Sequence, residues 1–308
     1  MTEKRRVILL FLDGIGIGSA DSRTNPFLTA NLPTLQGLLD QRNPGLGPQA
    51  NDTPYGKAVV KALDPLMGME DLPQSGTGQT ALLTGENAAA IYGRHFGPWV
   101  PVPLRPLMME KNVLTRALAQ GFSTTFANAY PSGYIQQAWT KRPGGPALAA
   151  HGAGLLTRTE SELGRGEAVS SEFLNSAWRT RLEIPGLPEI SVEEAGGNLG
   201  RIAKPFQLTF FAHYATDTAG HTKALGPAKK ALERVDTFLG GLLPAMPTRT
   251  LLFLASDHGN IEDITQGHTR NPTFSLVLGP DADVVAEGLT TIMDVPGAIL
   301  AYLKDGVS

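Results

Sequence analysis

The chain of 308 residues contains no cysteine, and this absence excludes several kinds of chemistry. Disulfide bonds, zinc sites with thiolate ligands, iron–sulfur clusters and thiol nucleophiles all require cysteine. Any metal ion that the protein binds must therefore be held by nitrogen and oxygen ligands, such as imidazole and carboxylate groups.

Charged residues are also scarce. They make up 18% of the chain, and the formal net charge of -3 arises from acids and bases that are scattered along it. Proteins that bind nucleic acid or anionic membranes usually carry a strongly basic patch or stripe. We therefore expect a small-molecule partner, and neither nucleic acid nor a membrane.

Long hydrophobic runs are missing as well. The apolar stretch at residues 7–12 ends at Asp13, which makes it too short for a signal peptide and far too short to span a bilayer. The expected location is the cytoplasm. The chain is instead rich in glycine (35 residues) and proline (23 residues), a composition typical of a loop-rich, enzyme-like protein.

Short, continuous apolar runs predict strands that are buried on both faces, as in a parallel sheet. These runs cover residues 7–12, 122–127, 208–212, 250–255 and 274–278. Helical patterns lie between them at residues 33–40, 112–120, 227–243 and 293–303. This alternation predicts an α/β sandwich, in which ligands collect at the carboxyl ends of the strands.

The segment at residues 86–204 differs from the rest of the chain. It contains all three tryptophans and several proline-rich turns, and its strand–helix alternation is weak. We expect two parts: a catalytic α/β domain at residues 1–85 plus 205–308, and an inserted cap or substrate-specificity region at residues 86–204.

Three of the six histidines lie beside carboxylates just after predicted strands. Asp257 and His258 follow one apolar run, and His268 comes ten residues after His258. Asp217 and His221 are four residues apart, which places both on one face of a helical turn. Each pair alone also fits a helix cap or a surface turn. Together they favour a divalent-metal site with carboxylate and imidazole ligands.

Asp13 is followed by alternating glycines at positions 14, 16 and 18, which suggests a dinucleotide-binding loop as an alternative. That fingerprint would require glycine or alanine at the position of Ser19. It would also bring the carboxylate of Asp13 towards a pyrophosphate. A metal-binding aspartate explains the pattern better.

Residues 73–85 form a predicted loop of small residues that leads into a helix. A hydroxyl at a helix N-terminus can act as a nucleophile beside a bound anion, and both Ser75 and Thr77 offer a hydroxyl here. A simple N-cap is the alternative for either residue. No lysine follows the glycines, so the stretch is not a P-loop.

In order and spacing, these motifs resemble the alkaline phosphatase superfamily, and most closely its branch of cofactor-independent phosphoglycerate mutases and phosphopentomutases. The resemblance covers roughly residues 1–85 and 205–308. It implies a three-layer sandwich with a largely parallel central sheet and an inserted cap. It assigns one metal ion to Asp217, His221 and His268, and a second to Asp13, Asp257, His258 and Ser75.

The resemblance also implies a function. Ser75 lies ten residues before Gly85, where the superfamily carries its nucleophile, so the resemblance makes Ser75 our choice of nucleophile and Thr77 the fallback. Two divalent ions, Mn or Zn, would assist phosphoryl transfer from a small phosphate ester through a phosphoserine. Hydrolysis is the expected outcome. The alternatives are a phosphomutase and a non-catalytic, metal-binding regulatory protein.

The sequence departs from the mutases after the nucleophile, where they carry a Gly-His pair and this chain has Gly78 and Gln79. Their substrate-binding signatures are also missing from the insert. We take Arg94, His95, His213 and Arg270 as candidate substrate-binding residues. A structural turn is an alternative for residues 94–99, and a packed core position is an alternative for His213.

Overall fold

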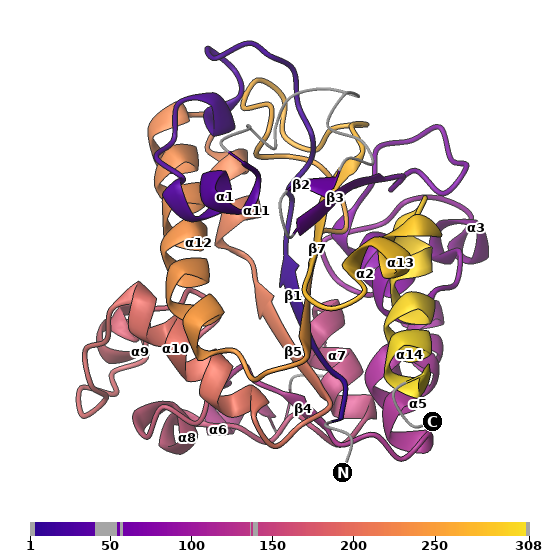
Figure 1. Cartoon of the computed structure of the whole chain (residues 1–308). Helices are drawn as coiled ribbons and strands as arrows, with labels where there is room; N and C mark the ends of the chain where they lie inside the picture. Colours follow the sequence, from indigo (N-terminus) through magenta and orange to yellow (C-terminus); the bar gives the residue numbers. More distant parts are fainter. Residues whose placement is uncertain (1–3, 41–53, 56–57, 136, 138–140, 306–308) are drawn as a thin grey trace.

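The computed structural model describes residues 4–40, 54–55, 58–135, 137 and 141–305. Within these residues, seven strands form one sheet in the order β2-β3-β7-β6-β1-β5-β4 (Figure 1). The strands are β1 (Arg6–Leu12), β2 (Pro54–Tyr55), β3 (Ala58–Leu63), β4 (Thr124–Phe126), β5 (Leu208–His213), β6 (Thr250–Ala255) and β7 (Thr273–Leu278). Strands β6, β1, β5 and β4 are parallel, whereas β7 runs antiparallel to β6 and β3. The prediction of an α/β fold with a largely parallel sheet is confirmed.

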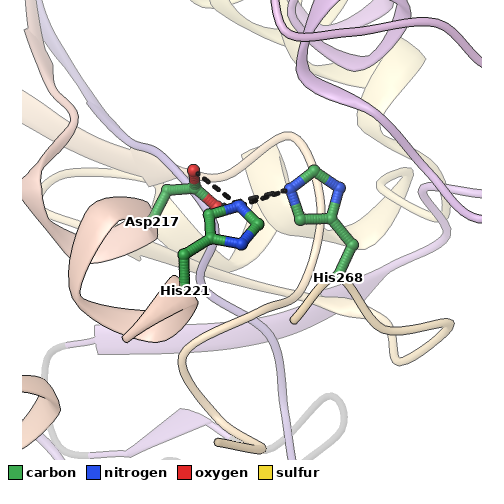
Figure 2. Close-up of side chains that lie close together, drawn as sticks. All are labelled: Asp217, His221 and His268. Carbon is green, nitrogen blue, oxygen red and sulfur yellow. Dashed lines mark hydrogen bonds and ion pairs between the residues drawn. The ribbon is translucent and has the colours of Figure 1, made fainter. Parts of the chain in front are cut away.

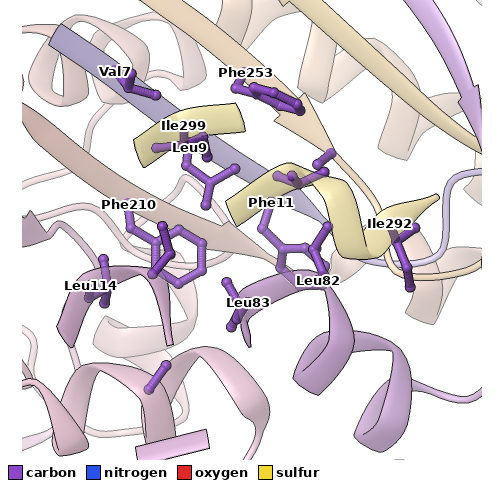
Figure 3. Close-up of a cluster of buried hydrophobic side chains, with 14 of the residues drawn as sticks. Val7, Leu9, Phe11, Leu82, Leu83, Leu114, Phe210, Phe253, Ile292 and Ile299 are labelled. Atoms are coloured by element: carbon purple, nitrogen blue, oxygen red, sulfur yellow. The ribbon is translucent and has the colours of Figure 1, made fainter. Parts of the chain in front are cut away.

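Strand β1 lies in the middle of the parallel part and is buried on both faces. Leu9 and Phe11 belong to one hydrophobic core, and Ile8 and Leu10 to the other, because successive side chains of a strand point to opposite faces. Figure 3 shows the first core, in which Phe11 and Leu9 lie among residues of the neighbouring strands and helices. A continuous apolar run is therefore what this central strand requires.

Helices cover both faces of the sheet and complete the three layers (Figure 1). One layer contains α1 (Pro33–Leu38), α10 (Val192–Ala203) and α12 (Leu225–Ala245). The other contains α2 (Ser75–Thr84), α5 (Val113–Ala119), α7 (Gly145–Gly152), α13 (Ala282–Glu287) and α14 (Val295–Asp305). Shorter helices connect these elements: α3 (Ala88–Tyr92), α4 (Arg105–Lys111), α6 (Ser132–Ile135), α8 (Glu160–Gly164), α9 (Ser176–Thr180) and α11 (Ala215–His221), with 3₁₀ turns at Pro26–Leu28, Val102–Leu104 and Ile292–Asp294.

All five predicted strands are present, and so are the four predicted helices and the helix that follows the Ser75 loop. The sequence prediction missed β3 because Lys61 interrupts its apolar run, although that lysine is buried. It also missed α10, whose glycines weaken the helical pattern. In the described ranges, no helix combines the length and the hydropathy needed to cross a bilayer.

The segment at residues 86–204 shares the sheet and the main core. Strand β4 pairs with β5, α10 packs against α12, and residues of α4, α5 and α7 belong to the first core. A small separate core also lies within the segment, formed by Ala129, Leu163, Ala168, Trp178 and Leu187. The boundary between catalytic domain and insert stays a prediction, and the part around Trp178 is the most independent piece of the segment.

Candidate metal centre

The predicted ligands come together at the carboxyl edge of the parallel strands. Asp13 directly follows β1, Asp257 lies two residues after β6, and α11 follows β5. Because β6, β1 and β5 are neighbours that run in the same direction, their carboxyl ends meet at one edge of the sheet. Residues from distant parts of the sequence therefore share one site.

Asp217, His221 and His268 form the first group (Figure 2). The Nε2 atom of His221 lies 3.3 Å from Oδ2 of Asp217 and 3.2 Å from Nε2 of His268. The Nε2 atom of His268 lies 3.5 Å from Oδ1 of Asp217. The first two residues come from α11 and the third from the loop before β7. The side chain of His221 is 50% exposed, so solvent reaches this group.

Asp13, Asp257 and His258 form the second group, and all three are buried. The Nε2 atom of His258 lies 3.4 Å from Oδ1 of Asp13 and 3.5 Å from Oδ2 of Asp257. The Oγ atom of Ser75, the first residue of α2, lies 3.0 Å from the same nitrogen. The rings of His258 and His268 stack with centroids 3.9 Å apart, so the two groups adjoin.

In the second group, negative charge on the two buried carboxyl groups would be uncompensated. Oδ1 of Asp13 and Oδ2 of Asp257 are buried without a hydrogen-bond partner. Burial raises the pKa of Asp13 well above its usual range, and the charges of Asp257 and Asp217 add to this effect. Burial also raises the pKa of Asp257. Unpaired buried carboxylates are costly, and a divalent cation would compensate them, so these residues fit a metal ion.

The first group behaves differently because its charges are paired. Burial alone would lower the pKa of His268, but the contact with Asp217 raises it. Burial alone would raise the pKa of Asp217, but the hydrogen bond from His268 and the charge of His258 lower it to about 2. Proton and metal ion compete for the same imidazole, so metal binding here should release a proton.

The non-ligating nitrogens of two histidines are fixed by backbone carbonyls. Nδ1 of His268 lies 2.8 Å from the carbonyl oxygen of Pro73, and Nδ1 of His258 lies 3.4 Å from that of Gly259. A carbonyl oxygen only accepts, so each Nδ1 carries the hydrogen and donates it. The Nε2 lone pairs are thereby directed at the site, as metal-binding imidazoles require.

Helix α2 lies close to the residues that follow β6 and brings Ser75 to His258. A Cβ atom at Gly78 would lie 2.8 Å from the carbonyl oxygen of Asp257, so only glycine permits this approach. The fallback nucleophile Thr77 is fully buried, and its hydroxyl lies 3.2 Å from the carbonyl oxygen of Gln74. The geometry therefore favours Ser75 over Thr77.

Two supporting residues of the centre were not predicted from the sequence. Asn260 donates its side-chain N–H to Oδ1 of Asp217 at 2.6 Å and thereby orients that carboxylate. Glu262 is completely buried, and its carboxylate accepts hydrogen bonds from the backbone N–H groups of Gly16 and Asn260, the hydroxyl of Thr269 and the side-chain amide of Asn271. Glu262 thus joins the loop after β1 to the loop that carries His268. The sequence contains one signal that could have pointed to Glu262, an acidic residue in an apolar setting between Ile261 and Ile264.

Two of the four candidate substrate-binding residues, His95 and His213, are buried. Nδ1 of His95 lies 3.2 Å from the hydroxyl of Thr77, and its Nε2 lies 3.1 Å from the carbonyl oxygen of Leu66. His213 is 1% exposed, bonds through Nδ1 to Ser171 and stacks on Phe173. Burial lowers the pKa of His213 to about 4. Both residues are packed inside the protein, and substrate binding by His95 and His213 stays a prediction.

The two candidate arginines are exposed. Arg270 follows the His268 loop, and its guanidinium donates to the backbone carbonyl of Glu70. Arg94 precedes the buried His95. Substrate binding by Arg94 and Arg270 stays a prediction.

Replacing Asp13 with asparagine should stabilise the metal-free protein, and increasingly so as the pH rises. The raised pKa of Asp13 means that the folded state retains a proton that the unfolded state has lost above about pH 4. Wild-type stability therefore falls from about pH 4 up to the raised pKa, and Asp13→Asn removes this loss. Urea unfolding of both proteins in the presence of a chelator, at several pH values, measures this difference in stability. If the stabilities of the two proteins change in parallel with pH, the raised pKa of Asp13 is contradicted.

Comparisons with known proteins show which proteins the chain is similar to. The family model described as Metalloenzyme superfamily matches residues 192–304. The 2,3-bisphosphoglycerate-independent phosphoglycerate mutase of Acinetobacter baylyi is 33% identical over 128 residues, which are 38% of this chain and 25% of the mutase. The chain thus matches about a quarter of the length of that relative.

Two solved structures share the fold over nearly the whole chain. The PH0037 protein from Pyrococcus horikoshii has a TM-score of 0.58 at 13% identity, and the alignment covers 99% of this chain and 98% of the other. A mutant of the alkaline phosphatase from the Antarctic bacterium TAB5, with Mg bound, has a TM-score of 0.54 at 13% identity and covers 99% of both chains. The chain therefore has the fold of these two proteins, and its residues 192–304 are similar to the Metalloenzyme superfamily.

Proposed function

We propose that this protein is a two-metal phosphoryl-transfer enzyme with Ser75 as the nucleophile. The observation that carries the proposal is the position of its Oγ atom, 3.0 Å from Nε2 of His258 and at the start of α2. One divalent ion would be held by Asp217, His221 and His268. The other would be held by Asp13, Asp257, His258 and Ser75. Mn is our first choice and Zn the second, because both accept carboxylate and imidazole ligands.

The reaction would proceed through a phosphoserine. When bound, the two ions would lower the pKa of the serine hydroxyl and offset the charge of the transferring phosphoryl group. Oγ of Ser75 forms a bond to phosphorus while the bond from phosphorus to the leaving oxygen breaks. A water molecule then cleaves the phosphoserine and releases inorganic phosphate. The substrate would be a small phosphate ester.

Exposure of the first group supports hydrolysis as the outcome. A mutase must keep water away from its phosphoenzyme while the substrate reorients, whereas a hydrolase requires only that water can enter. The half-exposed His221 lies on the side of the centre that water reaches. A phosphomutase is the second candidate, supported by the sequence similarity to phosphoglycerate mutases.

A substrate panel tests the proposal. Chelator-treated protein would be reloaded with Mn²⁺ or Zn²⁺ and incubated with sugar phosphates, phosphoglycerates and aryl phosphates. We expect metal-dependent release of free phosphate. Positional isomers without free phosphate would favour the mutase. Metal binding without any turnover would favour a non-catalytic regulatory protein and contradict the proposal.

A further inference from the structure

Gln79 is a buried amide that contacts the candidate metal centre without being one of its ligands. It lies one helical turn after Ser75 on α2 and is 3% exposed. Its Nε2 atom donates to Oδ2 of Asp13 at 3.1 Å, and its Oε1 atom accepts from the backbone N–H of Gly145 at 2.9 Å. The side chain therefore bridges the loop after β1 and the N-terminus of α7.

The two partners fix the orientation of the amide. A backbone N–H can only donate, so the oxygen of Gln79 must face Gly145. The NH₂ group then faces Asp13, whose carboxylate accepts. The arrangement needs close packing, because a Cβ atom at Gly145 would lie 2.7 Å from Cβ of Gln79.

This contact distinguishes the two oxygens of Asp13. Oδ2 is occupied by the amide, whereas Oδ1 is buried without a hydrogen-bond partner. The same Oδ1 lies 3.4 Å from Nε2 of His258, on the side where the other ligand atoms of the second group converge. A carboxylate held in this way offers one oxygen to a cation.

We propose that Gln79 is a positioning residue that presents only Oδ1 of Asp13 to the metal ion of the second group. The inference rests on the proposed function, because it requires a metal ion at that group. Through Gly145, the same amide links the ligand to the segment at residues 86–204.

Stepwise binding of Mn²⁺, measured by calorimetry, tests the role of Gln79. In Gln79→Met, which keeps the length of the side chain but cannot donate, we expect the affinity for one of the two ions to fall by about 10- to 100-fold. The affinity for the other ion should be unchanged. Gly145→Ala should lower the affinity for the same ion, because the added Cβ displaces the amide of Gln79 without touching a metal ligand. The electron paramagnetic resonance spectrum of the Mn²⁺ ion that binds with lower affinity should also change in both variants.

Thr84→Val is the matched control on the same helix, since its hydroxyl bonds only within and just after α2. It should bind both ions as the wild type does. If Gln79→Met does not fold, Gln79→Asn keeps the amide but is too short for both contacts, and the same loss is expected. Affinities of Gln79→Met or Gln79→Asn within twofold of the wild type would overturn the inference. A wild-type protein that binds neither Mn²⁺ nor Zn²⁺ would instead overturn the proposed function.

Discussion

Ser75→Ala is expected to reduce turnover of a phosphate ester by roughly 10⁴-fold or more, the order found when a nucleophile is removed from a covalent mechanism. Oγ of Ser75 points at His258 inside the buried group, and no other hydroxyl in the described part of α2 contacts a predicted ligand of that group. Metal binding by Asp217, His221 and His268 should persist, because Ser75 is not part of that group. Steady-state kinetics and metal content on the same samples measure both effects.

Thr77→Val is the comparison that separates the two candidate nucleophiles. It removes a hydroxyl that contacts Gln74 and His95, so it should affect stability more than chemistry. We expect it to retain most of the turnover. If Ser75→Ala stays active while Thr77→Val loses activity, the fallback nucleophile is the correct one.

Glu262→Met is expected to destabilise the protein by about 2 to 5 kcal/mol. The reason is that each buried donor left without its acceptor costs about 1 to 3 kcal/mol. The N–H groups of Gly16 and Asn260 belong to the backbone and cannot turn to find another partner. Glu262→Gln should cost less. Its oxygen can serve the two backbone groups, while the hydroxyl of Thr269 and the amide of Asn271 can turn to accept from the new NH₂ group.

Urea unfolding of these two variants in chelator measures the difference. The loops joined by Glu262 carry Asp13 and His268, so both variants should also bind metal more weakly, in the same order as their stability. Glu287→Gln, at an exposed position of α13, should match the wild type. Equal stability of Glu262→Met and Glu262→Gln would contradict the role of the fixed backbone donors.

The sequence was sufficient to predict the strands that carry the candidate site, and the resemblance to the superfamily supplied the grouping of its residues. Continuous apolar runs are unusual outside a doubly covered sheet, and β1, β5 and β6 all have them. Because parallel strands bring their carboxyl ends together, a polar residue just past each run is a strong signal. Asp13 and Asp257 satisfy this rule directly, and Asp217 follows within the next helix.

The supporting residues could not be predicted because their roles depend on contacts between distant segments. Gln79 meets Asp13 and Gly145 only after three elements have packed together. The charge of Glu262 is satisfied by donors that are separated in the sequence, such as Gly16 and Asn271. For His213, the pattern of a histidine after a strand was the same as for the candidate ligands, and only packing on Phe173 distinguishes it.

Ser75 is proposed to carry the phosphoryl group during turnover, as the nucleophile of the enzyme. Rapid quench of the Mn²⁺-loaded wild-type protein with a turned-over phosphate ester, followed by peptide mass spectrometry, tests this claim directly. We predict a transient phosphate on Ser75 that forms and decays at rates that match turnover. Phosphate on Thr77, or turnover without any phosphorylated peptide from α2, would contradict it.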